Sequence, residues 1–390
     1  MKSNTSLIWK SWLPVLALSF SAFVFNTTEF APVALLSDIA NSFDLDEAYA
    51  GQMITIYAWC VALLSLPLML LTAKIERKKL LMFLFLAFVF SHVISAYASN
   101  FYVLVFSRIC VAFSHGIFWS ITASLAYRLA PNGKGVRALS FLASGSALAM
   151  VLGLPIGRII GQAFGWRETF LSIGVLALFC MFVLYKLLPI LPSVSSGNIK
   201  SLPIILKRKV LVIIFLMTAF FVTANFCVYS YIEPFTQKIA NFSANFATMI
   251  LFFYGISGII GSVIFSKFAQ QNPKKVLNTS IILLFICFSL FLLMSKNEFS
   301  FVFICLVWGA SSICISLSLQ TKILEKASDA TDVAMSIFSS IFNIGIGGGA
   351  FIGGGIKLIF GLEYIGFGAM MIYLFVLFLM YMLHLQYKKI

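Results

Sequence analysis

The chain has 390 residues, of which 61% are hydrophobic and only 10% are charged. Soluble domains carry roughly one-quarter charged residues, so this composition excludes an ordinary water-soluble fold. The formal net charge of +14 could suit nucleic acid, but the basic residues lie in short connections between apolar runs, which argues against a nucleic-acid partner.

The apolar residues recur in runs of about 20, the length that crosses a hydrocarbon core as an α-helix. Segments such as 281–294 are apolar on every side, whereas a membrane-spanning strand alternates apolar and polar residues. The first run lacks an evident cleavage site and is too long for a signal peptide. The sequence therefore predicts an all-α membrane protein with twelve transmembrane helices, at residues 12–36, 48–72, 80–98, 101–128, 138–162, 169–188, 210–232, 244–268, 276–295, 299–322, 331–356 and 363–385.

Charge placement predicts the orientation of these helices. Most of the 27 Lys and Arg residues fall in the termini and in alternate connections, such as 74–79 and 200–209, while the connection 37–47 is acidic. Because basic connections stay on the cytoplasmic side, both termini are expected in the cytoplasm. An even number of spans is then required, and twelve meets that condition.

The chain divides into two halves around a hydrophilic connection rich in Pro, Ser and Lys. A shift of 196 residues aligns GLPIGRIIGQAFG (153–165) with GAFIGGGIKLIFG (349–361), and aligns the first and seventh helices more weakly. We expect two pseudo-symmetric six-helix bundles, at residues 1–188 and 210–390, joined by a cytoplasmic linker at 189–209. Two such bundles can rock about a solute held between them. Glycines between 345 and 355 allow the eleventh helix either to pack closely or to bend.

Three ionisable residues stand out inside predicted spans, where a charge is costly and indicates function: Glu29, Arg108 and Arg158. Glu29 and Arg108 each lie about 10 Å below the outer edge of their helices, so they can pair. Glu29 could exchange a proton there, since burial and a neighbouring arginine act on its charge in opposite senses. Alternatively, the two residues form a static ion pair. Arg158 is a rival partner for Glu29, or it extends to the interface.

Helical spacing gathers polar and aromatic side chains on the faces of four helices, which we expect to line a central cavity. Such a cavity would suit a polyhydroxylated solute, and it would suit many drugs as well. Trp59 and Trp308 are weaker candidates for stacking on a solute, because tryptophan in membrane proteins is often an anchor at the membrane interface. The candidate solute-binding residues are Asn26, Tyr57, His115, Trp119, Asn225, Tyr229, Ser340 and Asn343.

Catalytic and metal chemistry find no support in the sequence. All seven cysteines lie inside predicted spans without CxxC spacing, and they read as small buried hydrophobes. There is no GxSxG or HExxH motif. We therefore expect no enzyme activity, no catalytic residues, no metal site and no cofactor other than a proton gradient.

Several segments resemble the major facilitator superfamily, in its drug/proton antiporter branch, and are most similar to sugar efflux transporters of the SotB type. The segments are NTTEFAPVALLSDIA (26–40), AGQMITIYAW (50–59), SRICVAFSHGIFWSITASLA (107–126), GLPIGRIIGQAFGWRETF (153–170), YSYIEPF (229–235), FSANFAT (242–248) and DATDVAMSIFSSIFNIGIG (329–347). The connection KIERKK (74–79) departs from the superfamily's pattern because it lacks glycines.

The resemblance implies proton-driven export of sugars, such as arabinose or thiogalactosides, by a multi-pass protein of the bacterial inner membrane. It implies that Arg108 is the arginine of the superfamily's fourth-helix motif, and that Gly153, Pro155 and Gly157 belong to its fifth-helix antiporter motif. A multidrug/proton antiporter that exports amphipathic compounds is the alternative. We expect the protein to act as a monomer in the lipid bilayer.

Overall fold

The computed structural model describes residues 2–72, 74–131, 134–192, 202–269, 271–327, 329 and 331–387. Its regular elements in these residues are all helical. Twelve helices among them are long and apolar enough to cross a membrane, which confirms the twelve predicted spans. Residues 193–201 of the predicted linker lie outside the described residues.

The chain forms two compact units. The first contains residues 1–38 and 63–196, and the second contains residues 39–62 and 197–390. The division at the linker therefore stays a prediction, and it differs from these units in the place of residues 39–62. That segment includes most of α3, which packs with the second unit although helices α4 to α8 of the first unit follow it in the chain.

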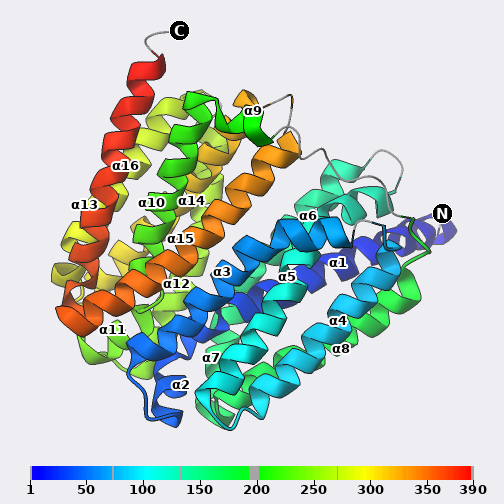
Figure 1. Ribbon diagram of the computed structural model, residues 1–390, viewed down its shortest axis with the longest axis horizontal. Helices are drawn as coiled ribbons and strands as arrows, with labels where there is room; N and C mark the ends of the chain where they lie inside the picture. The colour runs from blue at the N-terminus through cyan, green and yellow to red at the C-terminus, as the bar shows by residue number, and fades with distance from the viewer. Residues whose placement is uncertain are drawn as a thin grey trace. The chain divides into compact units, whose positions relative to one another are not determined.

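The first unit is built mainly from the helices that follow α3, together with α1. Its elements are α1 (Lys2–Ala34), α4 (Arg77–Ala96), α5 (Phe101–Leu129), α6 (Gly135–Leu148), the π-helical η1 (Ala149–Gly153), α7 (Leu154–Phe164) and α8 (Trp166–Leu187). Helix α4 packs between α5 and α8, and Figure 1 shows α4 and α8 side by side. Helix α1 packs against α6 and α8. The short helix α2 (Leu36–Ser42) follows α1 across the boundary between the units.

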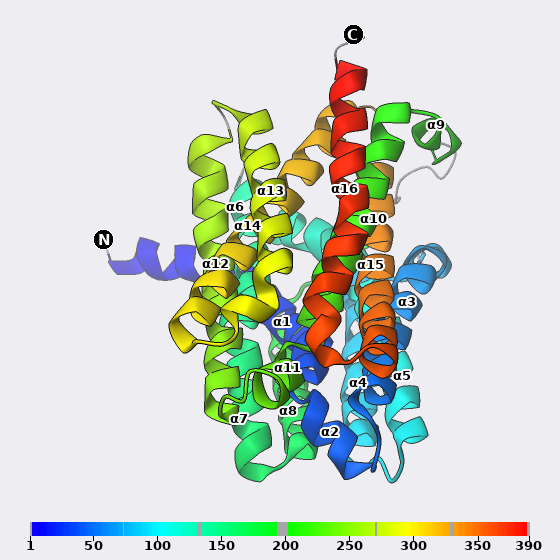
Figure 2. The ribbon, with the colours of Figure 1, turned by 90° about the vertical axis from the view of Figure 1, so that its left-hand side faces the viewer.

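The second unit holds the remaining helices. They are α3 (Glu47–Leu71, up to Ala62), α9 (Leu202–Leu206), α10 (Lys209–Tyr229), α11 (Ile232–Lys238), α12 (Ala244–Phe268), α13 (Pro273–Met294), α14 (Glu298–Lys326), α15 (Thr331–Ile359), η3 (Leu362–Tyr364) and α16 (Ile365–Tyr387). Helix α10 packs between α15 and α16, as Figure 1 shows. Helix α14 packs against both α12 and α13, which Figure 2 shows beside it.

The internal repeat predicted from the sequence is visible in the helix boundaries. Helices α3 and α12 both have 25 residues, and α12 begins 197 residues after α3. Helices α5 and α14 both have 29 residues. The aligned glycines Gly165 and Gly361 both have positive φ angles, 107° and 105°, at the turn that precedes the last helix of each half. Only glycine adopts this conformation without strain, which accounts for a glycine at both positions.

The predicted fifth span, 138–162, is not one continuous α-helix. A π-helical turn, Ala149–Gly153, separates α6 from α7. Pro155 lies just after this turn and has no N–H to donate to the carbonyl of Val151, so the regular hydrogen-bond ladder cannot continue there. A Cβ on Gly153 would collide with the side chain of Thr27 on α1. The turn therefore lies where α6 and α7 press closely on α1.

Two glycine faces of α15 explain its packing. Gly345, Gly349 and Gly353 lie four residues apart and face α10, so a Cβ at Gly349 would come within 2.5 Å of the Thr223 carbonyl oxygen. Gly347 and Gly354 face α3 and its neighbour Tyr231. Small residues let helix backbones approach closely in a membrane, and the glycines of α15 serve that purpose here.

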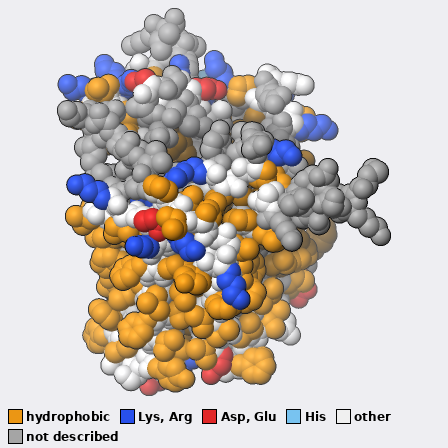
Figure 3. Space-filling view, turned by 90° about the vertical axis from the view of Figure 1, so that its right-hand side faces the viewer, with side chains coloured by type: hydrophobic (Ala, Val, Ile, Leu, Met, Phe, Trp, Pro, Cys, Tyr) orange, Lys and Arg blue, Asp and Glu red, His pale blue; other side chains and the backbone are white. Residues whose placement is uncertain are grey.

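Large apolar side chains cover much of the outer surface of the helices. Figure 3 shows them gathered over the face in view, with Lys and Arg side chains mainly above them. Phe83, Phe90, Phe179 and Phe182 are more than half exposed on α4 and α8, and Phe378 is more than half exposed on α16. Such a surface is stable against lipid chains and would aggregate in water.

Candidate functional site

Glu29 lies on α1 in the interior of the first unit, with 9% of its surface exposed. Its Oε2 atom is 3.5 Å from Nε2 of His115 on α5. One turn before Glu29, the ring of Phe25 stacks on Phe118 and Phe88, with centroids 4.0 and 4.1 Å apart. The carboxyl group thus lies beside an imidazole and one turn from a stack of phenylalanine rings, in surroundings where a charge is costly.

Arg108 lies two turns before His115 on α5 and is 1% exposed. Its Nη1 donates to the Thr28 hydroxyl and its Nη2 donates to the Thr28 carbonyl, both at 2.8 Å. That carbonyl is open to the arginine because the residue four positions later is Pro32, which has no N–H to complete the α-helical bond. The guanidinium also interacts electrostatically with Glu29.

Arg158 has other partners. It lies on α7 and is 1% exposed, and its Nη1 donates to the carbonyl of Ala34, the last residue of α1. A cation at a helix C-terminus is favourable because the last carbonyls carry negative partial charge. Burial raises the pKa of Asp38 on α2, and the charge of Arg158 opposes that rise. Arg108 is thus bonded to Thr28, the residue before Glu29, whereas Arg158 is bonded to the C-terminal end of α1.

The second unit contains a buried cluster of aromatic and amide groups around Asn225. The Oδ1 atom of Asn225 accepts from Trp308 Nε1 at 2.7 Å and from Ser312 Oγ at 2.9 Å. The Tyr254 hydroxyl lies 3.5 Å from the same oxygen. Tyr229, one turn after Asn225 on α10, has its ring 4.7 Å from that of Tyr254. Three helices, α10, α12 and α14, thus contribute to one polar and aromatic cluster.

The remaining predicted residues lie in several places. Asn26 donates to the carbonyl of Ser146 on α6 at 3.4 Å. Trp119 packs against His115, with ring centroids 6.1 Å apart. Tyr57 is 1% exposed on α3, in the second unit. Asn343 on α15 donates to the carbonyl of Ser339, while its Oδ1 is buried without a hydrogen-bond partner.

The other predicted positions are Ser340, one turn before Ile344 on α15, and the residues Gly153, Pro155 and Gly157 at the junction of η1 and α7. In the first unit lie Asn26, Glu29, Arg108, His115, Trp119 and the three residues of the junction; in the second lie Tyr57, Asn225, Tyr229, Ser340 and Asn343. Of these residues, the described contacts bring Glu29, His115 and Trp119 together in the first unit, and Asn225 and Tyr229 together, through Tyr254, in the second.

Four side chains in these clusters were not predicted from the sequence. Thr28 and His92 belong to the Glu29 group, and Tyr254 and Ser312 belong to the Asn225 group. Trp308, a weaker stacking candidate from the sequence, belongs to the Asn225 group as well, because its side chain is 1% exposed and bonded to Asn225. Its spacing of four residues from Ser312 was the available signal.

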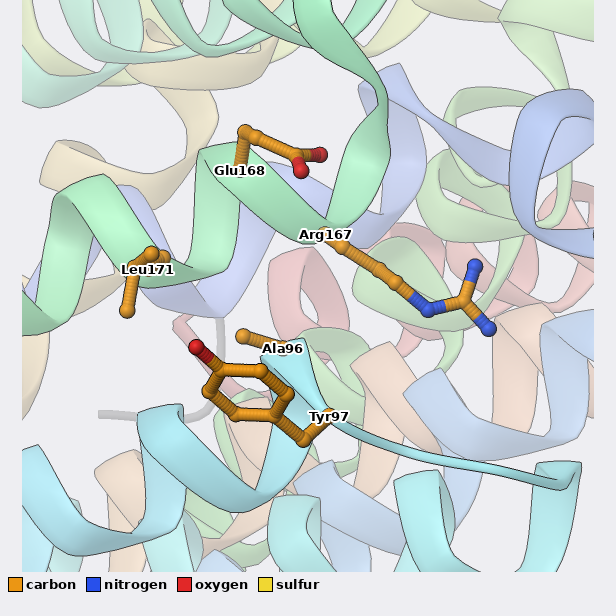
Figure 4. A pocket seen from close by; sticks show the side chains of 5 residues that line it. All are labelled: Ala96, Tyr97, Arg167, Glu168 and Leu171. Atoms are coloured by element: carbon orange, nitrogen blue, oxygen red, sulfur yellow. The ribbon is translucent and has the colours of Figure 1, made fainter.

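A pocket of about 300 Å³ lies elsewhere, at the end of α4 and the beginning of α8. Figure 4 shows the side chains that line it, which are those of Ala96, Tyr97, Arg167, Glu168 and Leu171. None of the predicted site residues lines this pocket. It is therefore separate from both buried clusters.

Comparison with known proteins places the chain in a family. The sequence model of the Major Facilitator Superfamily matches residues 18–349. Among solved structures, a bacterial homologue of the human lysosomal transporter Spinster, in an inward-facing and unoccupied conformation, is 15% identical, with a TM-score of 0.68 over 96% of this chain and 95% of the other. A mutant of the nucleoside transporter NupG is 14% identical, with a TM-score of 0.74 over 96% and 99% of the two chains. At these identities the two structures show a shared fold. The family match covers most of the chain and identifies it as a multi-pass membrane transporter, not an enzyme, that belongs to the major facilitator superfamily.

Proposed function

We propose that this protein exports small sugars in exchange for protons across the bacterial inner membrane. It acts as a monomer by alternating access, with both termini in the cytoplasm. The observation that carries the proposal is the buried group of Glu29, His115 and Arg108, which supplies one carboxyl group able to take up and release a proton. The branch of the superfamily and the choice of sugar rest on the resemblance of the sequence segments given above.

Glu29 has the surroundings that proton exchange needs. It is 9% exposed and has an imidazole nitrogen at 3.5 Å and an arginine within electrostatic reach. A carboxyl group in apolar surroundings favours the protonated state, whereas the arginine favours the ionised state. A shift of α5 relative to α1 would change that balance. Conformation and protonation are thereby linked.

The Asn225 cluster has the chemistry of a sugar-binding site. A carboxamide and two hydroxyl groups can exchange hydrogen bonds with sugar hydroxyls. The rings of Tyr229, Tyr254 and Trp308 offer apolar faces for the C–H groups of a sugar. Asn225 and Tyr254 retain 6% and 7% of their surface exposed, so the cluster is not entirely sealed.

Transport in proteoliposomes tests the proposal. Wild-type protein should drive labelled arabinose or a thiogalactoside against its gradient when an opposing proton gradient is imposed. Glu29→Gln should abolish this accumulation while sugar still moves down its own gradient. Glu298→Gln, at the exposed first turn of α14, is the matched control and should behave as wild type. Gradient-driven accumulation at the wild-type rate in Glu29→Gln would refute the coupling role.

A multidrug/proton antiporter is the second candidate, and the aromatic character of the Asn225 cluster is the observation in its favour. Three rings, Tyr229, Tyr254 and Trp308, lie within 6.2 Å of one another. They could pack against an amphipathic drug as well as against a sugar. Cells that overproduce the protein should resist lipophilic cations, without any sugar flux in vesicles, if this candidate is correct.

A further inference from the structure

His92 on α4 is fully buried and is bonded to Thr28, beside Glu29 on α1. Its Nδ1 atom is 2.8 Å from the carbonyl oxygen of Phe88, and its Nε2 atom is 2.7 Å from the hydroxyl of Thr28. That hydroxyl also accepts from Arg108. A continuous chain of hydrogen bonds therefore runs from Arg108 through Thr28 and His92 to a backbone carbonyl.

Arg108 can only donate, and the Phe88 carbonyl can only accept, so the Nδ1 atom of His92 carries a hydrogen. A second hydrogen, on Nε2, would place a positive charge beside the buried guanidinium of Arg108, which is unfavourable. The Nε2 atom therefore accepts from Thr28, whose oxygen is left to accept from the arginine. His92 is therefore the neutral tautomer with its hydrogen on Nδ1, and every donor and acceptor in the chain of hydrogen bonds has a partner.

Thr28 differs in this respect from its neighbour. The hydroxyl of Thr27 donates to the Phe23 carbonyl at 2.8 Å, which is the usual local bond of threonine in a helix. The hydroxyl of Thr28 is turned to His92 instead. His92 thus holds the Thr28 oxygen in the orientation in which it receives Arg108.

The surroundings of His92 fix the position of its ring. The ring lies 4.2 Å from that of Phe88 and 6.3 Å from that of Phe170, which in turn lies under the guanidinium of Arg108. On α8, a Cβ at Gly174 would come within 3.0 Å of the Cβ of His92. Helix α8 therefore packs directly onto the histidine. A closely packed ring is a rigid support for the groups bonded to it.

We propose that His92 is a positioning residue for proton coupling. It acts through the Thr28 hydroxyl to hold the Arg108 guanidinium against α1, at the place where that charge acts on Glu29. The inference rests on the proposed function, because it assigns His92 a part in the coupling attributed to Glu29. His92 itself stays neutral and does not exchange the proton.

Two substitutions distinguish a His92 that positions Arg108 from a His92 that only fills space. His92→Leu removes both ring nitrogens at similar volume, and His92→Gln keeps an acceptor near the position of Nε2. We expect the maximal rate of gradient-driven sugar transport to fall about tenfold in His92→Leu, the cost of a lost hydrogen bond in a charged network. Its KM and its downhill flux should stay within about twofold of wild type. His92→Gln should recover most of the rate.

A double-mutant cycle with Thr28→Val tests the route through which His92 acts. If His92 acts through the Thr28 hydroxyl, the double variant should be no slower than Thr28→Val alone. Thermal unfolding in detergent, followed for every variant, identifies any variant that has lost its fold. Independent, multiplicative losses in folded protein would overturn the inference, as would a wild-type rate in His92→Leu or a His92→Gln variant as slow as His92→Leu.

The outcome for Glu29→Gln distinguishes failure of this inference from failure of the proposed function. A Glu29→Gln variant that loses coupling, beside a His92→Leu variant that keeps it, would refute the role of His92 alone. Wild-type coupling in Glu29→Gln would refute the proposed function itself.

Discussion

The charged cluster at the start of α3 allows a quantitative prediction. Lys357 on α15 pairs with both Asp46 and Glu47, with its Nζ atom 2.6 Å from Glu47 Oε2. Lys238 on α11 also pairs with Glu47. The side chain of Glu47 is 3% exposed and that of Lys357 is 11% exposed, whereas Lys238 is 51% exposed. Lys357 is thus the buried counterion of a buried carboxylate.

Lys357→Met should weaken the packing of α3 on α15, and the free-energy cost of the substitution can be worked out from the ion pairs. Removing one partner of a buried ion pair costs about 3–5 kcal/mol, because the other charge remains buried. Lys238 stays bonded to Glu47 and offsets part of that cost, while the half-exposed Asp46 adds less than about 1 kcal/mol. We therefore expect the free energy that holds α3 against α15 to fall by about 2 kcal/mol. The fraction of molecules in which these two helices are apart should then rise roughly thirtyfold.

A cysteine at Ala48 provides the assay. Ala48 is 3% exposed, and its Cβ lies 3.4 Å from a Cβ built on Gly354 of α15, so a thiol there is shielded while the two helices are packed. The labelling rate of Ala48→Cys with a membrane-impermeant maleimide should rise roughly thirtyfold when Lys357→Met is added. Labelling of protein without Ala48→Cys measures the contribution of the seven native cysteines.

Two controls make this prediction refutable. Adding Glu47→Gln to Lys357→Met removes the buried charge that has lost its buried counterion and should return labelling to within a few fold of the wild-type rate. Lys296→Met alters an exposed lysine and should have no effect. Unchanged labelling in Lys357→Met would refute the reasoning, as would faster labelling after Glu47→Gln is added to it.

Two further predictions concern packing in the second unit. Gly349→Ala should destabilise the protein by about 1–3 kcal/mol, because its Cβ would meet the α10 backbone, whereas Gly355→Ala, which has nothing within 4 Å, should stabilise α15 by up to about 1 kcal/mol. Thermal unfolding in detergent compares the two, and equal effects would contradict the packing argument. Trp308→Phe keeps an aromatic ring but removes the donor to Asn225. It should lower stability by about 1 kcal/mol and weaken sugar binding several-fold in equilibrium dialysis, and unchanged affinity would separate the cluster from the sugar site.

The helices themselves could be predicted because lipid imposes a simple rule on the sequence. A spanning helix needs about 20 apolar residues, and its ends carry recognisable residues, such as Asn100, Ser243 and Asn297, whose side chains cap α5, α12 and α14. The repeat could be predicted for a similar reason, since Gly165 and Gly361 meet the same steric demand in both halves. These features depend on local sequence.

The partners of each helix could not be predicted in the same way. Ser19, Asn26 and Glu29 lie at positions i, i+7 and i+10 of one helix and so share a face of α1. Ser19 and Asn26 nevertheless donate to carbonyls of α6, while Glu29 meets α5. The close approach of α6 depends on Gly145, where a Cβ would collide with Ser19. Spacing identifies which residues share a face, but the neighbour that covers each part of that face depends on side chains far away in the sequence.

The same limitation applied to His92. Nothing within α4 distinguishes it from a histidine that merely fills space, and its proposed role depends on the hydrogen bond between its Nε2 atom and Thr28 on α1. Pro32 is the local signal that could have led to it. Because a proline leaves the carbonyl four residues earlier without its helical partner, a buried donor such as Arg108 is required near Thr28.

Helix α15 packs in different ways against its two neighbours α10 and α3. Its glycines facing α10 place backbone directly on backbone, and side chains cannot fill the gap if the helices part. On the α3 side, Thr55 and Trp59 donate to the carbonyls of Gly347 and Ile344, which already accept within the helix. In the part of the chain that the structure describes, parting α3 from α15 would expose these two side-chain donors, the charged cluster and the faces of Gly347 and Gly354, and water can hydrate the donors and the charges. In the alternating access proposed above, we therefore expect α15 to keep α10 and to release α3, so that the rate of labelling at Ala48 follows the transport cycle while the packing at Gly349 does not change.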